Sequence, residues 1–156
     1  MRVGILIRGL PGSGKTTLAL KLKTLLTGPR TTVSVVENDL VRKVLNNDYQ
    51  YDVSDYELVR SVTRGIVRGL LEQEHLVIVS NVFSTLDSIS NISDQFDKFV
   101  IINCSYQGES VYGVSGASVE SIRERWETHP SELPFTSESP LAGLVEIIQK
   151  TLMERL

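Results

Sequence analysis

The chain has 156 residues, of which 41% are apolar and 22% are charged, and it carries a net charge of −3 at pH 7. This size and composition predict one globular domain spanning residues 1 to 156, and they exclude a disordered chain. No apolar stretch approaches the roughly 20 residues that cross a bilayer, so no membrane partner is expected. The single cysteine, Cys104, leaves no internal disulfide, which favours the reducing cytoplasm.

Residues 9 to 16 read Gly-Leu-Pro-Gly-Ser-Gly-Lys-Thr and fit the pattern G-x-x-x-x-G-K-[ST] of a phosphate-binding loop. An apolar β-branched run precedes the loop and a helical pattern follows it, which is the context that this motif needs. Lys15 is expected to reach the β- and γ-phosphates, and the Thr16 hydroxyl to bind magnesium. The predicted nucleotide-binding residues are Gly9, Leu10, Pro11, Gly12, Ser13, Gly14, Lys15, Thr16 and Thr17.

Strands and helices alternate along the chain. Strands are predicted at residues 3 to 8, 32 to 36, 75 to 80 and 98 to 103, with a further short strand near Phe135. Helices are predicted at residues 15 to 26, 38 or 39 to 45, 54 to 73, 87 to 96, 118 to 127 and 141 to 156. This alternation predicts an α/β P-loop NTPase fold with a mostly parallel sheet of four to five strands and helices on both faces. Such a sheet binds ligands at the carboxyl ends of its strands.

Asp39 and Arg42 follow the second predicted strand and lie three residues apart at a helix start, so they share one face. Both are expected near the γ-phosphate, at the carboxyl edge of the sheet. A carboxylate at that place can accept the proton of an attacking hydroxyl, and an arginine can hold a substrate phosphate. The alternative is an N-cap aspartate beside an ordinary surface arginine.

The octapeptide and the pair Asp39-x-x-Arg42 together resemble the polynucleotide kinase branch of the small P-loop kinases. The resemblance implies that Asp39 is the general base and that Arg42 contacts the phosphate next to the acceptor hydroxyl. It also implies that ATP is the phosphate donor and that Mg²⁺ is a cofactor.

Asn81 follows the third predicted strand, where many P-loop NTPases have an acidic residue that holds magnesium. Asparagine can orient a water molecule but brings no charge. Magnesium would then depend on Thr16, on the phosphates and on Asp39. The alternative is that Asn81 only caps a turn.

Arg123 and Arg125 are candidates to offset the charge that develops during phosphoryl transfer, because kinases often bring such arginines from a lid. The lid is predicted at about residues 104 to 127, which begin with a glycine- and serine-rich loop. The two arginines are two residues apart and cannot share a helix face, so at most one is expected to reach the nucleotide. The alternative is that both are solvated.

Residues 106 to 127 resemble a group of phage-encoded ATP-binding proteins of the same kinase superfamily, some of which phosphorylate hydroxymethyluracil in DNA. This resemblance implies a role in DNA modification, in the host cytoplasm if the protein is phage-encoded. Because the chain is acidic overall, DNA would have to be held by local arginines. Arg60, Arg64 and Arg68 recur every four residues and form one cationic stripe, which could follow a phosphate backbone or be an ordinary solvated helix face.

The sequence therefore predicts an ATP-dependent kinase that phosphorylates a hydroxyl of a nucleic acid, either a hydroxymethylated base or a 5′ end. A small-molecule or nucleoside kinase is the nearest alternative. An ATPase switch is an alternative of another class. The sequence leaves open the acceptor, the choice between ATP and GTP, and the oligomeric state.

Overall fold

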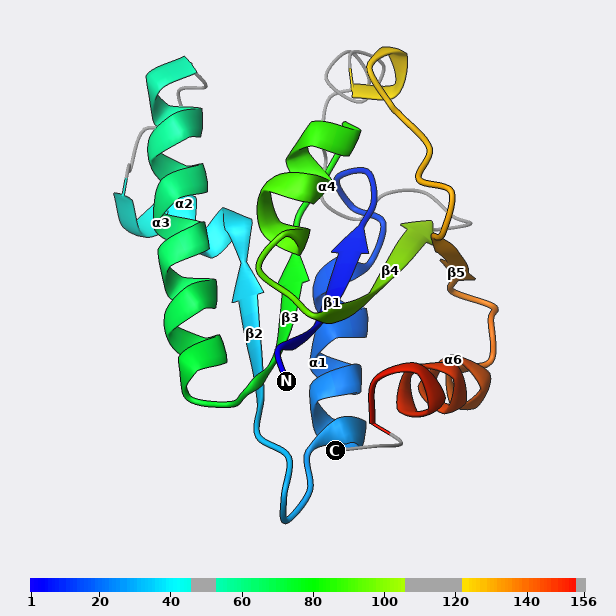
Figure 1. Cartoon of the computed structure of the whole chain (residues 1–156). Helices are drawn as coiled ribbons and strands as arrows, with labels where there is room; N and C mark the ends of the chain where they lie inside the picture. Colours follow the sequence, from blue (N-terminus) through cyan, green and yellow to red (C-terminus); the bar gives the residue numbers. More distant parts are fainter. Residues whose placement is uncertain (46–52, 106–121, 154–156) are drawn as a thin grey trace.

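A computed structural model describes residues 1–45, 53–105 and 122–153, without the side chains of residues 53–56. The strands form one five-stranded parallel sheet in the order β2-β3-β1-β4-β5 (Figure 1). The strands are β1 (Val3–Arg8), β2 (Val33–Glu37), β3 (Leu76–Ser80), β4 (Lys98–Ser105) and β5 (Leu133–Thr136). The predicted α/β fold with a parallel sheet is confirmed, including the short strand near Phe135.

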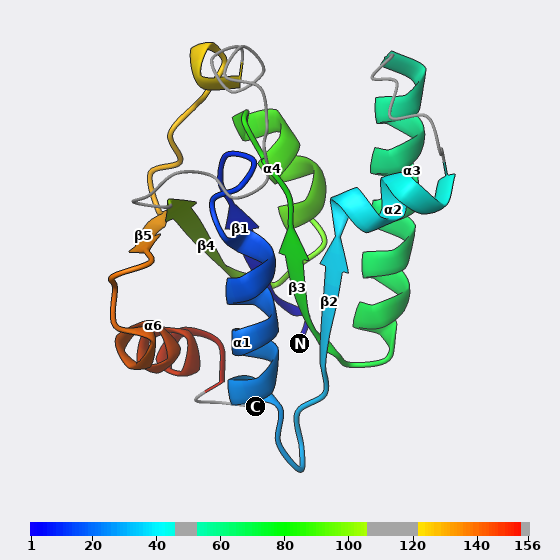
Figure 2. The ribbon, with the colours of Figure 1, turned by 180° about the vertical axis from the view of Figure 1, so that it is seen from behind.

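Helices cover both faces of the sheet (Figures 1 and 2). One face packs against α1 (Lys15–Leu26), α6 (Leu141–Ile148) and the π-helical turn η1 (Gln149–Met153). The other face packs against α3 (Val53–Glu72) and α4 (Leu86–Ser93), with the short α2 (Asn38–Leu45) beside them. Because parallel sheets are buried on both faces, their strands are apolar runs, and β1 and β3 are buried along their whole length.

The alternation of side chains along the strands decides which polar groups meet at the carboxyl edge. Leu76 and Ile78 of β3 pack with α1, whereas Val77 and Val79 pack with α3 and α4. Since successive side chains point to opposite faces, Ser80 lies on the α1 face. By the same rule Arg8, two residues after Leu6, lies on the face of α3 and α4.

Three predicted helices differ from the observed ones. The helix predicted from residue 87 begins at Leu86, because Thr85 and Ser88 form a capping box in which Thr85 Oγ1 accepts from the Ser88 amide. The described part of the helix predicted at 118 to 127 ends at Glu124, and residues 118–121 lie outside the described residues. The last predicted helix changes at Gln149 to the wider η1, which keeps Leu152 buried below Ile148.

None of the described helices is both long enough and apolar enough to span a membrane.

Candidate nucleotide site

The phosphate-binding loop joins the carboxyl end of β1 to the start of α1. Gly12 and Gly14 adopt φ angles of 79° and 93°, which side chains other than glycine rarely accept. A Cβ atom on Gly9 would lie 2.4 Å from the Cys104 carbonyl oxygen, so the loop also needs glycine where it passes β4. These backbone requirements explain why the motif has glycine at these positions.

Lys15 folds back over its own loop. Its Nζ donates to the carbonyl oxygens of Gly9 and Leu10, both at 3.0 Å. Burial lowers the pKa of the Lys15 ammonium, and the negative charges of Asp39 and Glu37 act in the opposite direction. The arrangement gives a desolvated cation at the mouth of the loop, within the electrostatic field of the end of β2 and the start of α2.

Cys104 supports the loop from β4. Its thiol donates to the Ser13 carbonyl oxygen at 3.2 Å, and the residue is 5% exposed. Burial raises the pKa of the Cys104 thiol, so the group stays protonated and serves as a small hydrogen-bonding core residue.

Asp39 and Arg42 form the predicted pair on α2. Arg42 Nη1 lies 3.7 Å from Asp39 Oδ1, and the Asp39 side chain is 81% exposed while that of Arg42 is only 16% exposed. Asp39 is thus open to an incoming molecule, with a partly buried arginine beside it. The negative charge of Asp39 opposes the lowering of the Lys15 pKa, so the two predicted sites lie within electrostatic range of each other.

Glu37 is a residue of this edge that the sequence prediction missed. It ends β2 directly opposite Ser80 of β3. Val33 and Val35 of β2 pack on the α1 side, so Glu37 points to the same face as Ser80 and the start of α1. The signal in the sequence is a glutamate at the end of an apolar strand, on β2 and not after β3.

Asn81 lies one residue beyond β3, and its side chain bonds to the backbone of the next residue. Its side-chain oxygen accepts from the Val82 amide at 2.8 Å, and its own amide donates to the Ile7 carbonyl oxygen at 3.1 Å. The last residue of β3 that faces α1 is Ser80, which is 5% exposed. Of the two readings of Asn81, the structure supports the turn cap.

Arg123 and Arg125 are both exposed, and they belong to the helical turn that begins at Ile122. This turn lies above the carboxyl ends of the strands, in yellow (Figure 1). Most of the predicted lid, residues 106–121, lies outside the described residues. The cationic stripe on α3 is engaged in ion pairs with Asp87, Asp94 and Glu72, which supports its interpretation as a structural helix face. Arg64 also donates to the Asn91 carbonyl oxygen, which joins α3 to α4.

The parallel sheet with the loop after β1 gives the protein the fold of the P-loop NTPases. The family model described as "Chromatin associated protein KTI12" matches residues 4–85, which is more than half of the chain, and the chain belongs to this family. No curated protein matches the sequence.

Solved structures show the same fold. An APS kinase, CysC of Mycobacterium tuberculosis, in complex with AMPPNP and APS, is 18% identical, with a TM-score of 0.74 over 97% of this chain and 98% of that one. Kti12 of Chaetomium thermophilum, in complex with ADP-AlF3, is 12% identical, with a TM-score of 0.73 over 96% and 98%. A chain of the Pnkp1/Rnl/Hen1 complex is 18% identical, with a TM-score of 0.55 over 89% of this chain and 43% of that one.

Proposed function

We propose that this protein is an ATP-dependent phosphotransferase that moves the γ-phosphate to a hydroxyl group of a nucleic acid. The observation that carries the proposal is the meeting of two charged sites at one sheet edge. The buried Lys15 ammonium lies in the phosphate-binding loop, and the exposed Asp39 carboxylate, whose charge acts on it, lies at the start of α2. One site suits the donor nucleotide and the other suits the acceptor.

The donor side is formed by residues 9 to 17. Backbone amides of the loop and the positive end of α1 can bind the triphosphate, and Lys15 would exchange its two carbonyl partners for phosphate oxygens. Two structural neighbours contain nucleotide analogues, AMPPNP and ADP-AlF3. A nucleoside triphosphate is therefore the expected ligand of this loop.

Magnesium fits the oxygen donors of this edge, which are the Thr16 hydroxyl and the Asp39 and Glu37 carboxylates. Among the described residues no group of three or more His, Cys, Asp or Glu could hold a metal alone, which suits a cation that arrives with phosphate oxygens. Bound there with the nucleotide, magnesium would neutralise part of the phosphate charge. Glu37 takes the place of the acidic residue that β3 lacks.

The acceptor side is formed by Asp39 and Arg42. Asp39 accepts the proton of the attacking hydroxyl, and its exposure leaves it accessible to a large substrate. Arg42 holds the phosphate next to that hydroxyl. Arg123 or Arg125 offsets charge on the transferring group.

A nucleic-acid acceptor is supported by the sequence resemblance to polynucleotide kinases and to kinases of hydroxymethyluracil in DNA. A structural neighbour within the Pnkp1/Rnl/Hen1 complex is consistent with it. A small-molecule acceptor is the competing case, since other neighbours are an APS kinase and a sugar kinase.

A second candidate function is a nucleotide-dependent ATPase switch. Membership of the KTI12 family favours it, together with the likeness to a Kti12 structure that holds ADP-AlF3. In that case water replaces the hydroxyl acceptor at Asp39.

A labelling experiment separates these functions. The protein is incubated with γ-labelled ATP or GTP, magnesium and a panel of acceptors, namely DNA and RNA with 5′ hydroxyls, hydroxymethyluracil DNA, nucleosides and APS. Label on a nucleic acid supports the proposal. Label on a small molecule shows a small-molecule kinase instead, and label released only to water favours the ATPase.

Asp39→Asn tests the proposed base. We expect the variant to lose transfer by about a hundredfold or more, because the proton acceptor is removed. Nucleotide affinity measured in EDTA, where the proposed magnesium ligand plays no part, should stay near the wild-type value. Asp97→Asn is the matched control, because the Asp97 carboxylate accepts from the Arg2 amide near the start of β1, at the other end of the sheet. Normal transfer by Asp39→Asn would exclude Asp39 as the base.

A further inference from the structure

Arg8 is a buried arginine that directly precedes the phosphate-binding loop. Its side chain is 0% exposed, and it donates four hydrogen bonds. Nε and Nη2 donate to the Phe83 carbonyl oxygen at 3.1 and 2.6 Å, and Nη2 also donates to the Glu127 carbonyl oxygen at 2.8 Å. Nη1 forms an ion pair with Glu132 at 2.9 Å, and the guanidinium stacks on the Trp126 ring, 4.0 Å from its centroid.

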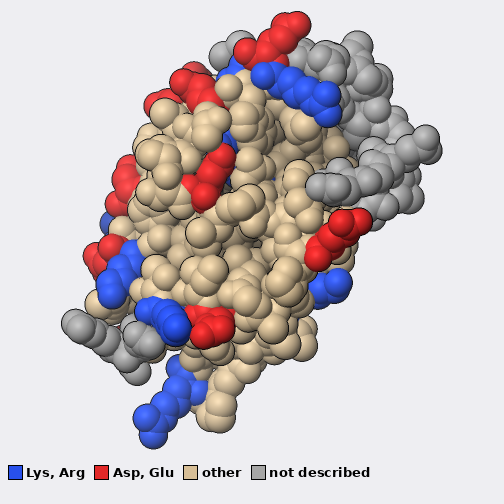
Figure 3. Space-filling model, turned by 90° about the vertical axis from the view of Figure 1, so that its right-hand side faces the viewer, with Lys and Arg blue, Asp and Glu red and all other residues tan. Residues whose placement is uncertain are grey.

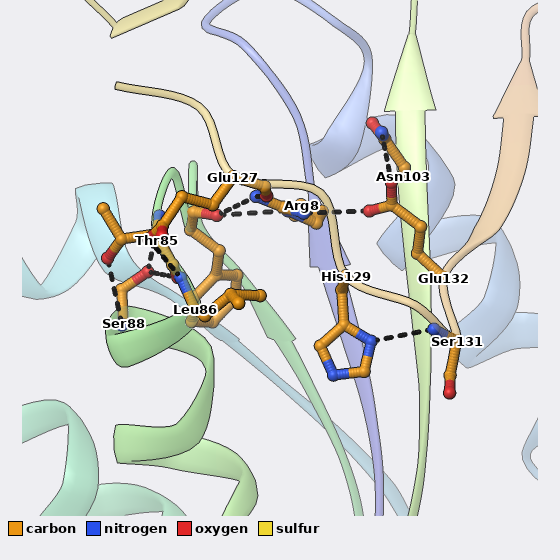
Figure 4. A network of polar contacts seen from close by, with 10 residues as sticks. Arg8, Thr85, Leu86, Ser88, Asn103, Glu127, His129, Ser131 and Glu132 are labelled. Atoms are coloured by element: carbon orange, nitrogen blue, oxygen red, sulfur yellow. Dashed lines mark hydrogen bonds and ion pairs between the residues drawn. The ribbon is translucent and has the colours of Figure 1, made fainter.

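The partners of Arg8 come mainly from one segment, residues Trp126 to Glu132, which we call the return segment. Figure 4 shows Glu127 and Glu132 of this segment beside Arg8. This segment is also fixed at other points. The Glu127 amide donates to the Ser84 carbonyl oxygen at 2.8 Å, and the Glu127 carboxylate accepts from the Leu86 amide at the start of α4. Glu132 accepts from Asn103 of β4 at 3.4 Å. The return segment therefore bridges the carboxyl ends of β1, β3 and β4.

The return segment continues directly from the turn that carries Arg123 and Arg125. The Trp126 amide donates to the Arg123 carbonyl oxygen at 3.2 Å, and the Arg125 amide donates to the Ile122 carbonyl oxygen at 3.1 Å. The backbone of both arginines is thus tied to Trp126 within one turn. Arg8 holds Trp126 and Glu127, and it is covalently joined to Gly9, the first residue of the loop.

We infer that Arg8 is a positioning residue, which sets the backbone of Arg123 and Arg125 relative to the phosphate-binding loop through the return segment. The inference rests on the proposed function, because it gives these two arginines a role at the nucleotide. Arg8 does not act on substrate itself, since four of its five N–H groups are used within the protein and none of its side chain is exposed.

The chemistry of the guanidinium supports a positioning role. A buried ion pair is a weak source of stability compared with apolar packing of the same volume, whereas the planar fork of arginine fixes direction. The Arg8 guanidinium binds the Phe83 carbonyl oxygen and the return segment, whose Trp126 ring stacks on it, at one point. Phe83 itself has a φ of 48°, an uncommon value for a non-glycine residue, and Arg8 holds its carbonyl with two N–H groups.

Trp126 is the only tryptophan of the chain, so its fluorescence reports on this contact directly. The test compares Arg8→Lys, which keeps the charge but loses the fork, with the wild type. The matched control is Arg30→Lys, because Arg30 is exposed in the turn between α1 and β2, at the opposite end of the sheet (Figure 1). Three quantities are measured, namely acrylamide quenching of Trp126, nucleotide affinity and turnover of γ-phosphate.

For Arg8→Lys we expect Trp126 to become more accessible to the quencher and turnover to fall by about tenfold or more, with nucleotide Kd within about threefold of wild type. Arg30→Lys should match the wild type in all three quantities. Trp126→Phe should retain turnover, because phenylalanine keeps a ring under the guanidinium, whereas Trp126→Ala should lose it. Wild-type turnover in a folded Arg8→Lys, or unchanged quenching, would overturn the inference.

Circular dichroism shows whether Arg8→Lys is folded. If Arg8→Lys unfolds, Glu132→Gln is tested in its place. Glutamine keeps the shape of the Glu132 side chain but removes the charge that pairs with Arg8. The same results in quenching, affinity and turnover are expected. Should the wild type bind nucleotide but neither transfer nor hydrolyse it, the proposed function has failed. The attachment of the return segment to Arg8 is then judged by Trp126 quenching alone.

Discussion

Lys15 combines burial with a positive charge that a triphosphate would neutralise. Its ammonium donates to two loop carbonyls, and its pKa is lowered because those two hydrogen bonds do not replace the lost hydration. A bound triphosphate favours the charged form and raises the pKa again. Nucleotide binding and protonation of Lys15 are therefore linked.

This linkage predicts a pH dependence of affinity. Below the lowered pKa of Lys15 the ammonium is present before binding, and affinity is at its full value. As pH rises through that pKa toward the ordinary lysine value of 10.5, binding must take up a proton, so Kd should rise by up to about tenfold per pH unit. Titration calorimetry in two buffers of different ionisation enthalpy measures the proton uptake.

Lys15→Ala should bind nucleotide more weakly than wild type, and its affinity should not fall further as pH rises through the alkaline range. Lys23→Ala serves as the control, since Lys23 is exposed in the last turn of α1, and it should keep the wild-type profile. If the affinity of Lys15→Ala fell with pH as it does in the wild type, a group other than Lys15 would be responsible for the pH dependence.

Glu37 gives a second prediction at the residue scale. Its carboxylate faces the start of α1 from the end of β2, opposite Ser80. With magnesium, Glu37→Gln should weaken nucleotide binding by about tenfold, the order found for residues that support a metal. Without magnesium, the same variant should bind at least as well as wild type, because a negative charge near the phosphates is gone. Fluorescent-nucleotide titrations with magnesium and with EDTA measure both values.

The control for Glu37→Gln is Glu72→Gln on α3, where Glu72 pairs with Arg68 at the surface. It should leave both affinities unchanged. An equal loss with and without magnesium in Glu37→Gln would point to a packing role for Glu37 instead of a role with the metal.

At the scale of elements, β1 and the segment after α4 show how tightly the sheet is covered. Gly4 of β1 passes the Phe96 ring so closely that a Cβ atom would lie 2.4 Å from it. Gly4→Ala should therefore lower the free energy of unfolding by about 1–3 kcal/mol, through overpacking. Urea denaturation measures the change. Adding Phe96→Leu to Gly4→Ala should cost less than the sum of the two single changes, because the smaller side chain relieves the clash.

Gly143→Ala in α6 is the comparison, since the nearest atom to its Cβ would be Pro140 Cγ at 3.9 Å. Alanine at a helical position should raise the free energy of unfolding by up to about 1 kcal/mol. If Gly4→Ala and Gly143→Ala lowered the free energy of unfolding equally, the clash with Phe96 would not explain the effect at Gly4.

The elements could be predicted from local patterns, and their long-range links could not. The bounds of β1 and α1 follow from an apolar run, the glycine loop and the stop at Gly28 and Pro29. The Arg8 contacts join residues 75 to 124 positions apart, and no periodicity relates them. Placing Glu37 at the site requires the alternation of side chains within β2, which the sequence pattern alone did not bring out. The Thr85 cap was missed because its partner is Ser88, whereas the usual capping box has a glutamate or glutamine there.

At the scale of the whole molecule, the chain is acidic overall, with a net charge of −3 at pH 7. On the side that carries β5 and α6, basic and acidic side chains are interspersed, and the described residues form no continuous basic area there (Figure 3). The α3 arginines are paired with carboxylates. A nucleic-acid substrate would thus be held by few contacts near the site.

Because few basic side chains would contact DNA phosphates, we expect DNA binding to depend only weakly on salt concentration. If Arg42 and one of Arg123 and Arg125 meet phosphates, the slope of log K against log salt should be about −2 on duplex DNA, at roughly −0.9 per contact. Fluorescence anisotropy with labelled DNA measures the slope. Combined replacement of Arg60, Arg64 and Arg68 by Gln should leave it unchanged, whereas Arg42→Gln should make it shallower by about one. A slope steeper than about −5 that is lost in the triple variant would make α3 the DNA-binding face.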